Sequence, residues 1–186
     1  MIGGLLNTQR LQLARLTPDD VALVHKLNSF AQVARFNTIG IPKDIEITRG
    51  HCANVIGQLK EDKPANYAWI IRQKDSGDFV GEIGLNLSVA RYKKGEVFFS
   101  LLPEFWGQGY AREAANAVLK FGFESLDLHR IEAGVAVPNE KSIALIERLG
   151  MQREGRHRKI LPLAMGFTDN YSYAILKEDW DAHTPD

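Results

Sequence analysis

Along the N-terminal half of the chain, the spacing of apolar residues changes from that of a strand to that of a helix and then back to that of a strand. In "RLQLARL" they occupy every second position, which predicts a first strand. In "TPDDVALVHKLN" the spacing is helical, with Thr17 as a favoured N-cap and Pro18 at the first helical position. A second helical region covers roughly Thr48 to Lys60. "NYAWIIRQ", "KDSGD" and "FVGEIGLNLSV" then form a strand–turn–strand pattern, and "EVFFSLL" follows the turn "RYKKG" as another strand.

Helices and strands alternate in the C-terminal half. Tyr110–Ser125 has alanine and aliphatic residues at helical spacing, "RIEAGVAV" predicts a strand, and "NEKSIALIERLG" predicts a helix closed by Gly150. "MQREGRHRKI" and "NYSYAIL" predict two terminal strands. This order of elements predicts an α/β (α+β) fold, with a single mixed, mostly antiparallel sheet and helices on both faces. We expect a single domain over residues 1–186, with its core at about 10–180.

Composition narrows the classes of function. The 186 residues are 45% hydrophobic, enough for one sizeable core, and 23 Lys and Arg balance 23 Asp and Glu. A chain without net charge has no overall field to attract DNA or an anionic membrane. No apolar run approaches the ~20 residues that span a bilayer. The single cysteine, Cys52, and an N-terminus unlike a secretion signal predict a cytoplasmic protein. The five histidines show no metal-ligand spacing, so we expect no metal site.

Two glycines one residue apart, Gly107 and Gly109, stand between the strand "EVFFSLL" and the helix that begins at Tyr110. Glycine permits positive φ and a close approach of the backbone to a ligand. The amides that follow would lie at a helix N-terminus, where the helix dipole favours an anion. No acidic residue precedes Glu113 in that helix, and Arg112 adds positive charge. The pattern indicates an anion site, although the same glycines are also typical of a simple tight turn.

Two nucleotide-binding motifs fit this loop poorly. A P-loop requires Gly-Lys-Ser or Gly-Lys-Thr, and the chain contains neither. A dinucleotide fingerprint would need a third glycine where the chain has Arg112. Asp127 stands near the position of the acidic residue that such sites use, but the antiparallel strands before the loop do not make a βαβ unit. The residues alone therefore leave the identity of the anion open.

Further segments occur in a recognisable order along the chain. They are "WGQGYAREA", "LDLHRIEA", the tetrapeptide Asn-Glu-Lys-Ser, and Gly150-Met151 at the end of the following helix, with "RLQLARLTPDD" and "GEIGL" upstream. Together they resemble the GNAT-fold N-acetyltransferases, and more narrowly the RimJ/RimL-type branch. The resemblance spans about Arg10 to Trp180. It implies a GNAT-like acyl-CoA N-acyltransferase fold and acetyl-CoA as the co-substrate.

By this resemblance, the anion is the pyrophosphate of acetyl-CoA. The residues expected to hold it, mainly through backbone amides, are Gly107, Gln108, Gly109, Tyr110, Ala111 and Arg112. The strand edge near Leu101 and Leu102 would hydrogen-bond the pantetheine arm as an added strand does. The family loop usually begins with Arg or Gln, where this chain has Trp106. We expect little loss from that change if the amides do most of the holding.

The helix after "VAVP" begins with Asn139 and Ser142, where the family contacts the cofactor arm. Asn139 is also a favoured helix N-cap. Many family members carry a tyrosine general acid where this chain has Ile146. Ser142 is therefore the candidate to donate a proton, or a hydrogen bond, to the departing thiolate. A solvent-facing serine without such a role is equally compatible with the sequence.

The general base is less well defined than the cofactor loop. Strand alternation places Glu96 on one face with Phe98 and Ser100, so Glu96 is the candidate to take the amine proton through water. A solvated glutamate at a strand end is the alternative. Some RimL-like enzymes place a glutamate in the penultimate strand region, where this chain has Leu161, and Asp169 lies nearby.

These features predict an N-acetyltransferase that moves the acetyl group of acetyl-CoA directly to a primary amine. An α-amine with a pKa of about 7.7–8.0 is roughly a tenth neutral at pH 7, whereas a lysine amine near about 10.4 is almost wholly charged. A weak base therefore favours a protein or peptide N-terminus. The alternatives are a small amine such as an amino acid, polyamine or antibiotic, and an acyl-CoA-binding module without catalysis. The loops that would select the acceptor, Phe36–Asp44 and Ile160–Asn170, carry no recognisable code. The oligomeric state stays open, a homodimer included.

Overall fold

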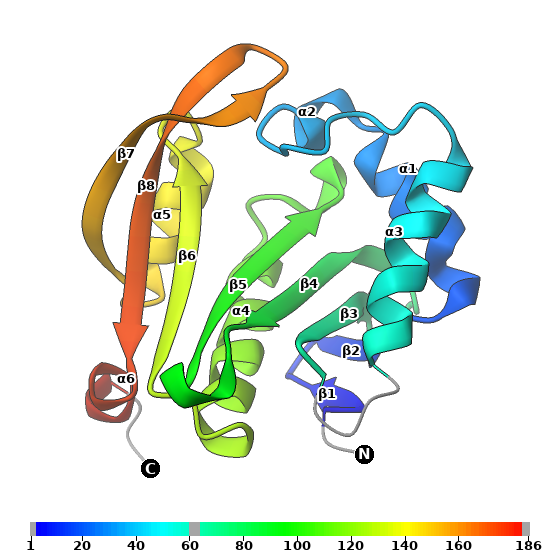
Figure 1. The fold of residues 1–186 in the computed structure, drawn as a ribbon. Coiled ribbons are helices and arrows are strands. Elements are labelled where there is room, and N and C mark those ends of the chain that lie inside the picture. The colour runs from blue at the N-terminus through cyan, green and yellow to red at the C-terminus, as the bar shows by residue number, and fades with distance from the viewer. Residues whose placement is uncertain (1–2, 60–63, 184–186) are drawn as a thin grey trace.

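The computed structural model describes residues 3–59 and 64–183. Within these residues the chain forms one sheet of eight strands in the order β1-β2-β3-β4-β5-β6-β8-β7 (Figure 1). Neighbouring strands are antiparallel except β5 and β6, which run parallel. The strands are β1 (Leu5–Asn7), β2 (Leu11–Arg15), β3 (Asn66–Gln73), β4 (Phe79–Leu87), β5 (Lys94–Leu101), β6 (Arg130–Ala136), β7 (Gln152–Leu163) and β8 (Gly166–Leu176). The helices are α1 (Val21–Asn28), α2 (Ala31–Ala34), α3 (Ile45–Gln58), α4 (Tyr110–Lys120), α5 (Glu140–Arg148) and α6 (Lys177–His183).

Strand β3 explains why the sheet is covered on both sides. Its residues Tyr67–Ile71 are buried in succession, which is the pattern of a strand with packing on both faces. Trp69 and Ile71 belong to a core that includes residues of α4 and α5, whereas Ile70 belongs to a second core with α1 and α3. The predicted single mixed, mostly antiparallel sheet with helices on both faces is confirmed.

Side-chain caps fix where the N-terminal helices begin. Thr17 precedes a 3-10 turn over Pro18–Asp20 that leads into α1, and both its amide and its hydroxyl donate to the carboxylate at the end of that turn, at 3.0 and 2.7 Å. Helix α3 begins at Ile45 rather than at the predicted Thr48. The reason is that the Asp44 carboxylate accepts two backbone amide hydrogen bonds at the helix start.

Short elements were not predicted from the sequence pattern. Strand β1 and helix α2 have three and four residues, too few for a repeating apolar pattern, and α6 was missed as well. The helix predicted to end at Ser125 is α4 followed by a π-helical turn over Phe121–Ser125. The predicted end of the second helical region, Lys60, lies outside the described residues. In the described part of the chain, no helix is long and apolar enough to cross a membrane.

Candidate active site

A gap opens in the sheet where β5 and β6 separate. The two strands pair only between Lys94–Glu96 and Arg130–Glu132. Beyond this pairing β5 continues to Leu101, and Figure 1 shows the two strands diverging toward their C-terminal ends. The helices that follow these strands, α4 and α5, are the two on which the sequence places the cofactor contacts. The gap therefore lies between the predicted contact regions.

The register of β4 and β5 decides which backbone groups face the gap. Leu102 N–H donates to Val80 O at 2.9 Å, which fixes the alternation of hydrogen-bonded and non-hydrogen-bonded pairs along the ladder. By this alternation Phe99 and Leu101 turn their N–H and C=O groups away from β4, toward the gap. The Leu101 carbonyl accepts from the Trp106 indole N–H at 2.8 Å. The groups left to bond an extended ligand arm are therefore both groups of Phe99 and the N–H of Leu101.

At Leu102 the backbone groups of the predicted strand edge are no longer free. Its N–H is bonded within the sheet, and its carbonyl accepts from Phe105 N–H at 3.0 Å. The Leu102 side chain is buried in the core beneath α1 and α3. The Leu102 backbone groups are therefore both bonded within the chain, and the open edge consists of Phe99 and the N–H of Leu101.

The loop before α4 has the geometry of an anion site. Gly107 and Gly109 have φ of +76° and +82°, the left-handed region that favours glycine. Among the described residues, no acceptor is paired with the amides of residues 107–112, which include the exposed Arg112 and the first residues of α4. Nothing lies within 4 Å of the position that a Cβ on Gly107 would take. The loop can therefore fit a diphosphate, which needs several amides and open space.

Glu113 explains why an acidic residue near the start of α4 does not oppose an anion. Its carboxylate turns to the β1–β2 connection, where it accepts from the Thr8 hydroxyl and from the backbone and Nε of Arg10, each of the latter at 2.7 Å. Partial burial raises the pKa of the Glu113 carboxyl, but these hydrogen bonds outweigh burial and hold the pKa below its usual value. Arg10 also donates to Gln108 O at 3.0 Å and lies 4.3 Å from the centre of the Tyr110 ring. Arg10 thus ties the glycine loop to the sheet.

Helix α5 brings Asn139 and Ser142 to the other side of the gap. The Asn139 side chain caps the helix by accepting from Ser142 N–H at 3.3 Å, so its capping role is confirmed. Ser142 is half-buried, and Ile146, one turn further on, is only 1% exposed. Lys141 Nζ lies 4.8 Å from the centre of the Trp106 ring, which joins the start of α5 to the glycine loop. The two predicted contact regions therefore meet across the gap.

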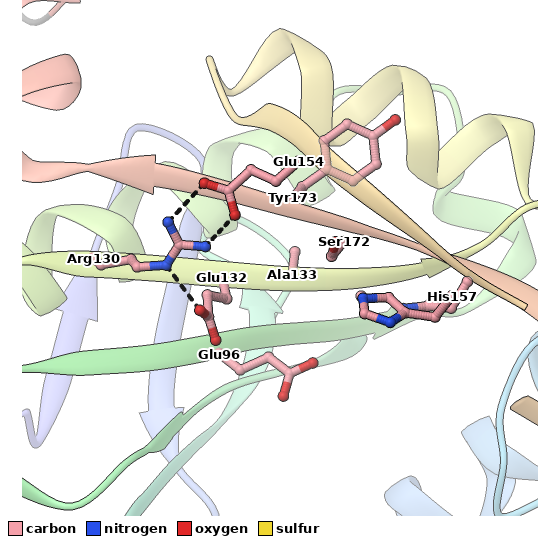
Figure 2. A pocket seen from close by; sticks show the side chains of 10 residues that line it. Glu96, Arg130, Glu132, Ala133, Glu154, His157, Ser172 and Tyr173 are labelled. Atoms are coloured by element: carbon pink, nitrogen blue, oxygen red, sulfur yellow. Dashed lines mark hydrogen bonds and ion pairs between the residues drawn. The ribbon is translucent and has the colours of Figure 1, made fainter. Parts of the chain in front are cut away.

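Glu96 lines a charged trough of about 320 Å³ on the face opposite α4 and α5 (Figure 2). The predicted alternation is confirmed, since Glu96 is exposed while its neighbour Val97 is buried. Figure 2 shows Arg130 bonded to both Glu132 and Glu154, whereas Glu96 makes no ion pair with any described residue. A Cβ on residue 134 would lie 3.4 Å from Glu96 Oε1, so glycine there leaves room for this carboxylate.

Asp169 has a structural role in the β7–β8 hairpin. Its carboxylate accepts from Lys159 N–H at 2.9 Å and from Arg156 Nε at 2.7 Å. These bonds hold the pKa of the Asp169 carboxyl below its usual value. A carboxylate so engaged is a poor base, which leaves Glu96 as the stronger of the two predicted candidates.

A further carboxylate, Glu82 on β4, was missed from the sequence. It is half-buried, and burial raises the pKa of its carboxyl to about 7. In "FVGEIGL" it is the one charged residue in an apolar strand. This would have pointed to a buried carboxylate only if both faces of the strand were known to be covered. As for metal ions, the described residues contain no group of three or more His, Cys, Asp and Glu placed to hold one.

The comparisons with known proteins agree with this geometry. A family model described as "Acetyltransferase (GNAT) domain" matches residues 10–152. The uncharacterized N-acetyltransferase YnaD of Bacillus subtilis is 30% identical over 176 residues, covering 95% of this chain and 99% of the relative. The crystal structure of a GNAT-family acetyltransferase from Bacillus anthracis superposes with a TM-score of 0.81 at 29% identity, over 94% of this chain and 99% of that one.

Two more distant structures share the fold but are enzymes named for different acceptors. The spermidine N-acetyltransferase of Vibrio cholerae, in complex with CoA and spermine, has a TM-score of 0.81 at 22% identity, over 92% of this chain and 98% of that one. The ribosomal-protein-S5-alanine acetyltransferase of Vibrio fischeri has a TM-score of 0.81 at 20% identity, over 95% and 98%. The shared fold therefore does not identify the acceptor of this enzyme. The chain belongs to the GNAT acetyltransferase family, as an enzyme for which acetyl-CoA is implied as the acyl donor.

Proposed function

We propose that this acetyltransferase acts on the α-amine of a protein or peptide N-terminus, of the ribosomal-protein type. The observation that carries the proposal is an apolar groove of about 380 Å³ between α2 and the tip of the β7–β8 hairpin. In Figure 1 this hairpin reaches toward α2 beyond the C-terminal end of β5. The groove is lined by Ala31, Ala34, Arg35, Gly40, Ile41, Ala164 and Met165.

The chemistry of this groove suits a peptide better than a polyamine. Its single charged lining residue is a cation, Arg35, whereas several ammonium groups would need carboxylates to replace their hydration. Large apolar side chains are exposed on the α2–α3 connection, at Ile39 and Ile41, and at the tip of the β7–β8 hairpin, at Met165 and Phe167. Contiguous exposed apolar surface marks a binding site for a protein or peptide more often than for a polycation. The first side chains of a peptide would lie here while its amine enters the gap.

A polyamine acceptor is the second candidate, and the charged trough is what favours it. Three carboxylates line the trough, from Glu96, Glu132 and Glu154. Arg130 bonds two of them, and Lys94 bonds Glu132 as well. Among the described residues, Glu96 is then the one carboxylate of the trough that is not paired with a cation. A single free carboxylate is too little negative charge to bind the several ammonium groups of a polyamine.

The residues of the gap suggest how the transfer is assisted. Acetyl-CoA supplies a thioester whose carbonyl carbon an amine can attack. The amides of residues 107–112 would hold its diphosphate, and the open edge at Phe99 and Leu101 would bind the pantetheine arm. An N–H on that edge would also polarise the thioester carbonyl, since a backbone donor aimed at developing negative charge lowers the barrier. Ser142 would stabilise the thiolate that departs.

The acceptor is tested with two peptides of one sequence and with spermidine. One peptide has a free N-terminus and no lysine, and the other has a blocked N-terminus and a single lysine. We expect kcat/KM at pH 7 to be at least thirtyfold higher for the free α-amine, because the pKa difference of about 2.5 units allows up to roughly 300-fold. Thiol release is the measurement. Equal rates for the two peptides, or faster release with spermidine, would refute the peptide N-terminus as acceptor.

A binding module without catalysis predicts a different result from the same assay. It would be stabilised against heat by acetyl-CoA but would release no thiol with any amine. The loop and gap alone are sufficient for that behaviour, so thiol release, not cofactor binding, is the deciding observation.

Replacing Ser142 with alanine should lower kcat about fivefold without changing the dissociation constant of acetyl-CoA. The reason is that one neutral hydrogen bond contributes about 1 kcal/mol, and a thiol with a pKa of about 8.5 leaves without a strong acid. Ser29→Ala, at an exposed serine on the C-terminal end of α1, is the matched control. An unchanged kcat would mean that Ser142 has no part in the departure of the thiolate.

A further inference from the structure

Glu82 lies on the face of the sheet that α1 and α3 cover, on the strand next to β5. In the register of the sheet it stands opposite Ile70 of β3 and Ser100 of β5. Directly opposite residues share one face of a sheet. Ile70 packs in the core beneath α1 and α3, so Glu82 and Ser100 face that side, away from α4. Ser100 is flanked by Phe99 and Leu101, whose backbone groups point into the gap.

The Asn28 amide is the polar side chain that faces the Glu82 carboxylate from α1. Asn28 is the last residue of that helix, and its amide opposes the rise that burial causes in the Glu82 pKa. Asn28 is itself fixed, because its Nδ2 donates to Val24 O at 3.1 Å and its Oδ1 accepts from Asn37 Nδ2 at 3.2 Å. Asn37 belongs to the connection between α2 and α3, one of the loops that border the apolar groove. A side chain that faces the carboxylate is therefore hydrogen-bonded to one of the loops that border the apolar groove.

No cation balances Glu82 among the described residues. The groups that face it are the Asn28 amide from α1, the Ser100 hydroxyl from β5 and the Cys52 thiol from α3. Burial raises the pKa of that thiol to about 11, with added repulsion from Glu82 and then Asp20. Arg72 Nη2 lies 3.2 Å from Asp20 and does not pair with Glu82. A half-buried carboxylate without a cation is costly, and an ammonium group from a ligand would relieve that cost.

Glu82 is better placed than Glu96 to serve an amine in the gap. Glu96 is four residues before Ser100, about 13 Å along the strand, at the end where β5 and β6 still pair. Phe98 stands between them and lies flat across β4, since a Cβ on Gly84 would come within 2.2 Å of its ring. Glu82 is on the neighbouring strand, directly opposite Ser100. The two form a hydrogen-bonded pair of the antiparallel ladder, and the Cα atoms of such a pair are about 5.5 Å apart.

We propose that Glu82 binds the ammonium group of the acceptor and takes its proton, directly or through one water, so that it is the general base of this enzyme. The inference rests on the proposed function. One proton moves from the ammonium nitrogen to a Glu82 oxygen. The neutral nitrogen then forms a bond to the acetyl carbon, the carbon–sulfur bond breaks, and its electron pair goes to sulfur. The second proton lost by nitrogen ends on the thiolate, giving an amide and free CoA.

The buried environment makes this transfer feasible for an α-amine. With Glu82 at a pKa of about 7, moving a proton from an α-amine is unfavourable by only about tenfold. A carboxyl at the ordinary value of about 4.3 would make it unfavourable by roughly 3,000-fold. A lysine amine would face a similar penalty of roughly 2,500-fold even with Glu82. The site therefore discriminates against lysine by basicity alone.

Glu82→Gln and Glu96→Gln form a matched pair for the test, with the free α-amine peptide as acceptor. We expect Glu82→Gln to lower kcat/KM at least 100-fold at pH 7.5, the usual loss for a general base. The acetyl-CoA dissociation constant from calorimetry should stay within twofold. The wild-type profile of kcat/KM should fall on the acid side with a midpoint near 7. In Glu82→Gln this midpoint should move up to the pKa of the free α-amine, about 7.7–8.0, because only amine that is already neutral in solution can then react. Glu96→Gln removes the base predicted from the sequence and so tests the competing assignment, and we expect it to lose less activity than Glu82→Gln.

Three outcomes would overturn the proposal. A Glu82→Gln enzyme that keeps its rate and the wild-type midpoint of the acid limb would show that Glu82 is no base, while the acetyltransferase function would stand. A 100-fold loss in Glu96→Gln alone would move the role to the trough. Absence of thiol release by the wild type with every amine would remove both the base and the proposed function. If Glu82→Gln unfolds, Glu82→Asp serves instead, with at least tenfold lower kcat/KM and a retained acid limb expected.

Discussion

Replacing Gly107 with aspartate should weaken acetyl-CoA binding about 100-fold, and replacing it with asparagine should change binding less than fivefold. Gly107 has φ of +76° and open space around its Cβ position. Asn and Asp tolerate this left-handed conformation better than other residues with a side chain, so both variants should fold. They have nearly the same shape and differ in one negative charge. The comparison therefore isolates the electrostatic part of binding.

The expected size follows from Coulomb's law. Two unit charges about 6 Å apart repel by roughly 0.7 kcal/mol in water and roughly 3 kcal/mol at an effective dielectric constant of 20. A diphosphate carries two charges, and the loop is exposed, so a net cost of about 2–3 kcal/mol is reasonable. Calorimetric titration with acetyl-CoA at two salt concentrations measures it, and added salt should reduce the difference. Equal affinities for the two variants would mean that the diphosphate does not lie at this loop.

An element could be predicted from the sequence wherever its periodic pattern of apolar residues was long enough to be recognised without knowledge of its contacts. Strands β3 to β6 and helices α4 and α5 each contain seven or more residues, and their apolar spacing is clear. The start of α3 was misplaced because the Asp44 cap, not the first apolar residue, sets it. Strand β1 and helix α2 have three and four residues, so neither is long enough for a repeating apolar pattern.

In the site, too, the features that depend on neighbouring residues could be predicted, and those that depend on contacts with other elements could not. The positive φ at Gly107 and Gly109 is a local property and was predicted. The direction in which Leu102 turns its N–H is a property of the ladder with β4, which the sequence pattern of β5 alone does not contain. Glu82 was overlooked because its chemistry arises from α1 and α3 closing over it. A carboxylate becomes a candidate base only after the fold has removed its water.

Glu82 should make the protein less stable as the pH rises from about 5 to 8, relative to Glu82→Gln. Its carboxyl has a folded-state pKa of about 7 against an ordinary value of 4.5. Folding therefore favours the protonated form. The resulting stabilisation is fully present below about pH 4.5 and is lost as the pH rises through 7. At about 1.36 kcal/mol per unit, the unfolding free energy of the wild type should fall by up to roughly 3 kcal/mol relative to the variant.

Glu113→Gln is the control, because Glu113 is shifted in the opposite direction. Hydrogen bonds from Thr8 and Arg10 overcome the effect of burial and lower the pKa of its carboxyl. Its stabilisation is present above about pH 4.5 and is lost only at lower pH, so the deficit of this variant should be constant from pH 5 to 8. Denaturant titrations at four pH values measure both differences. A flat difference between wild type and Glu82→Gln would mean that the Glu82 carboxyl is solvated, and a solvated carboxyl would lose its advantage as a base for an α-amine.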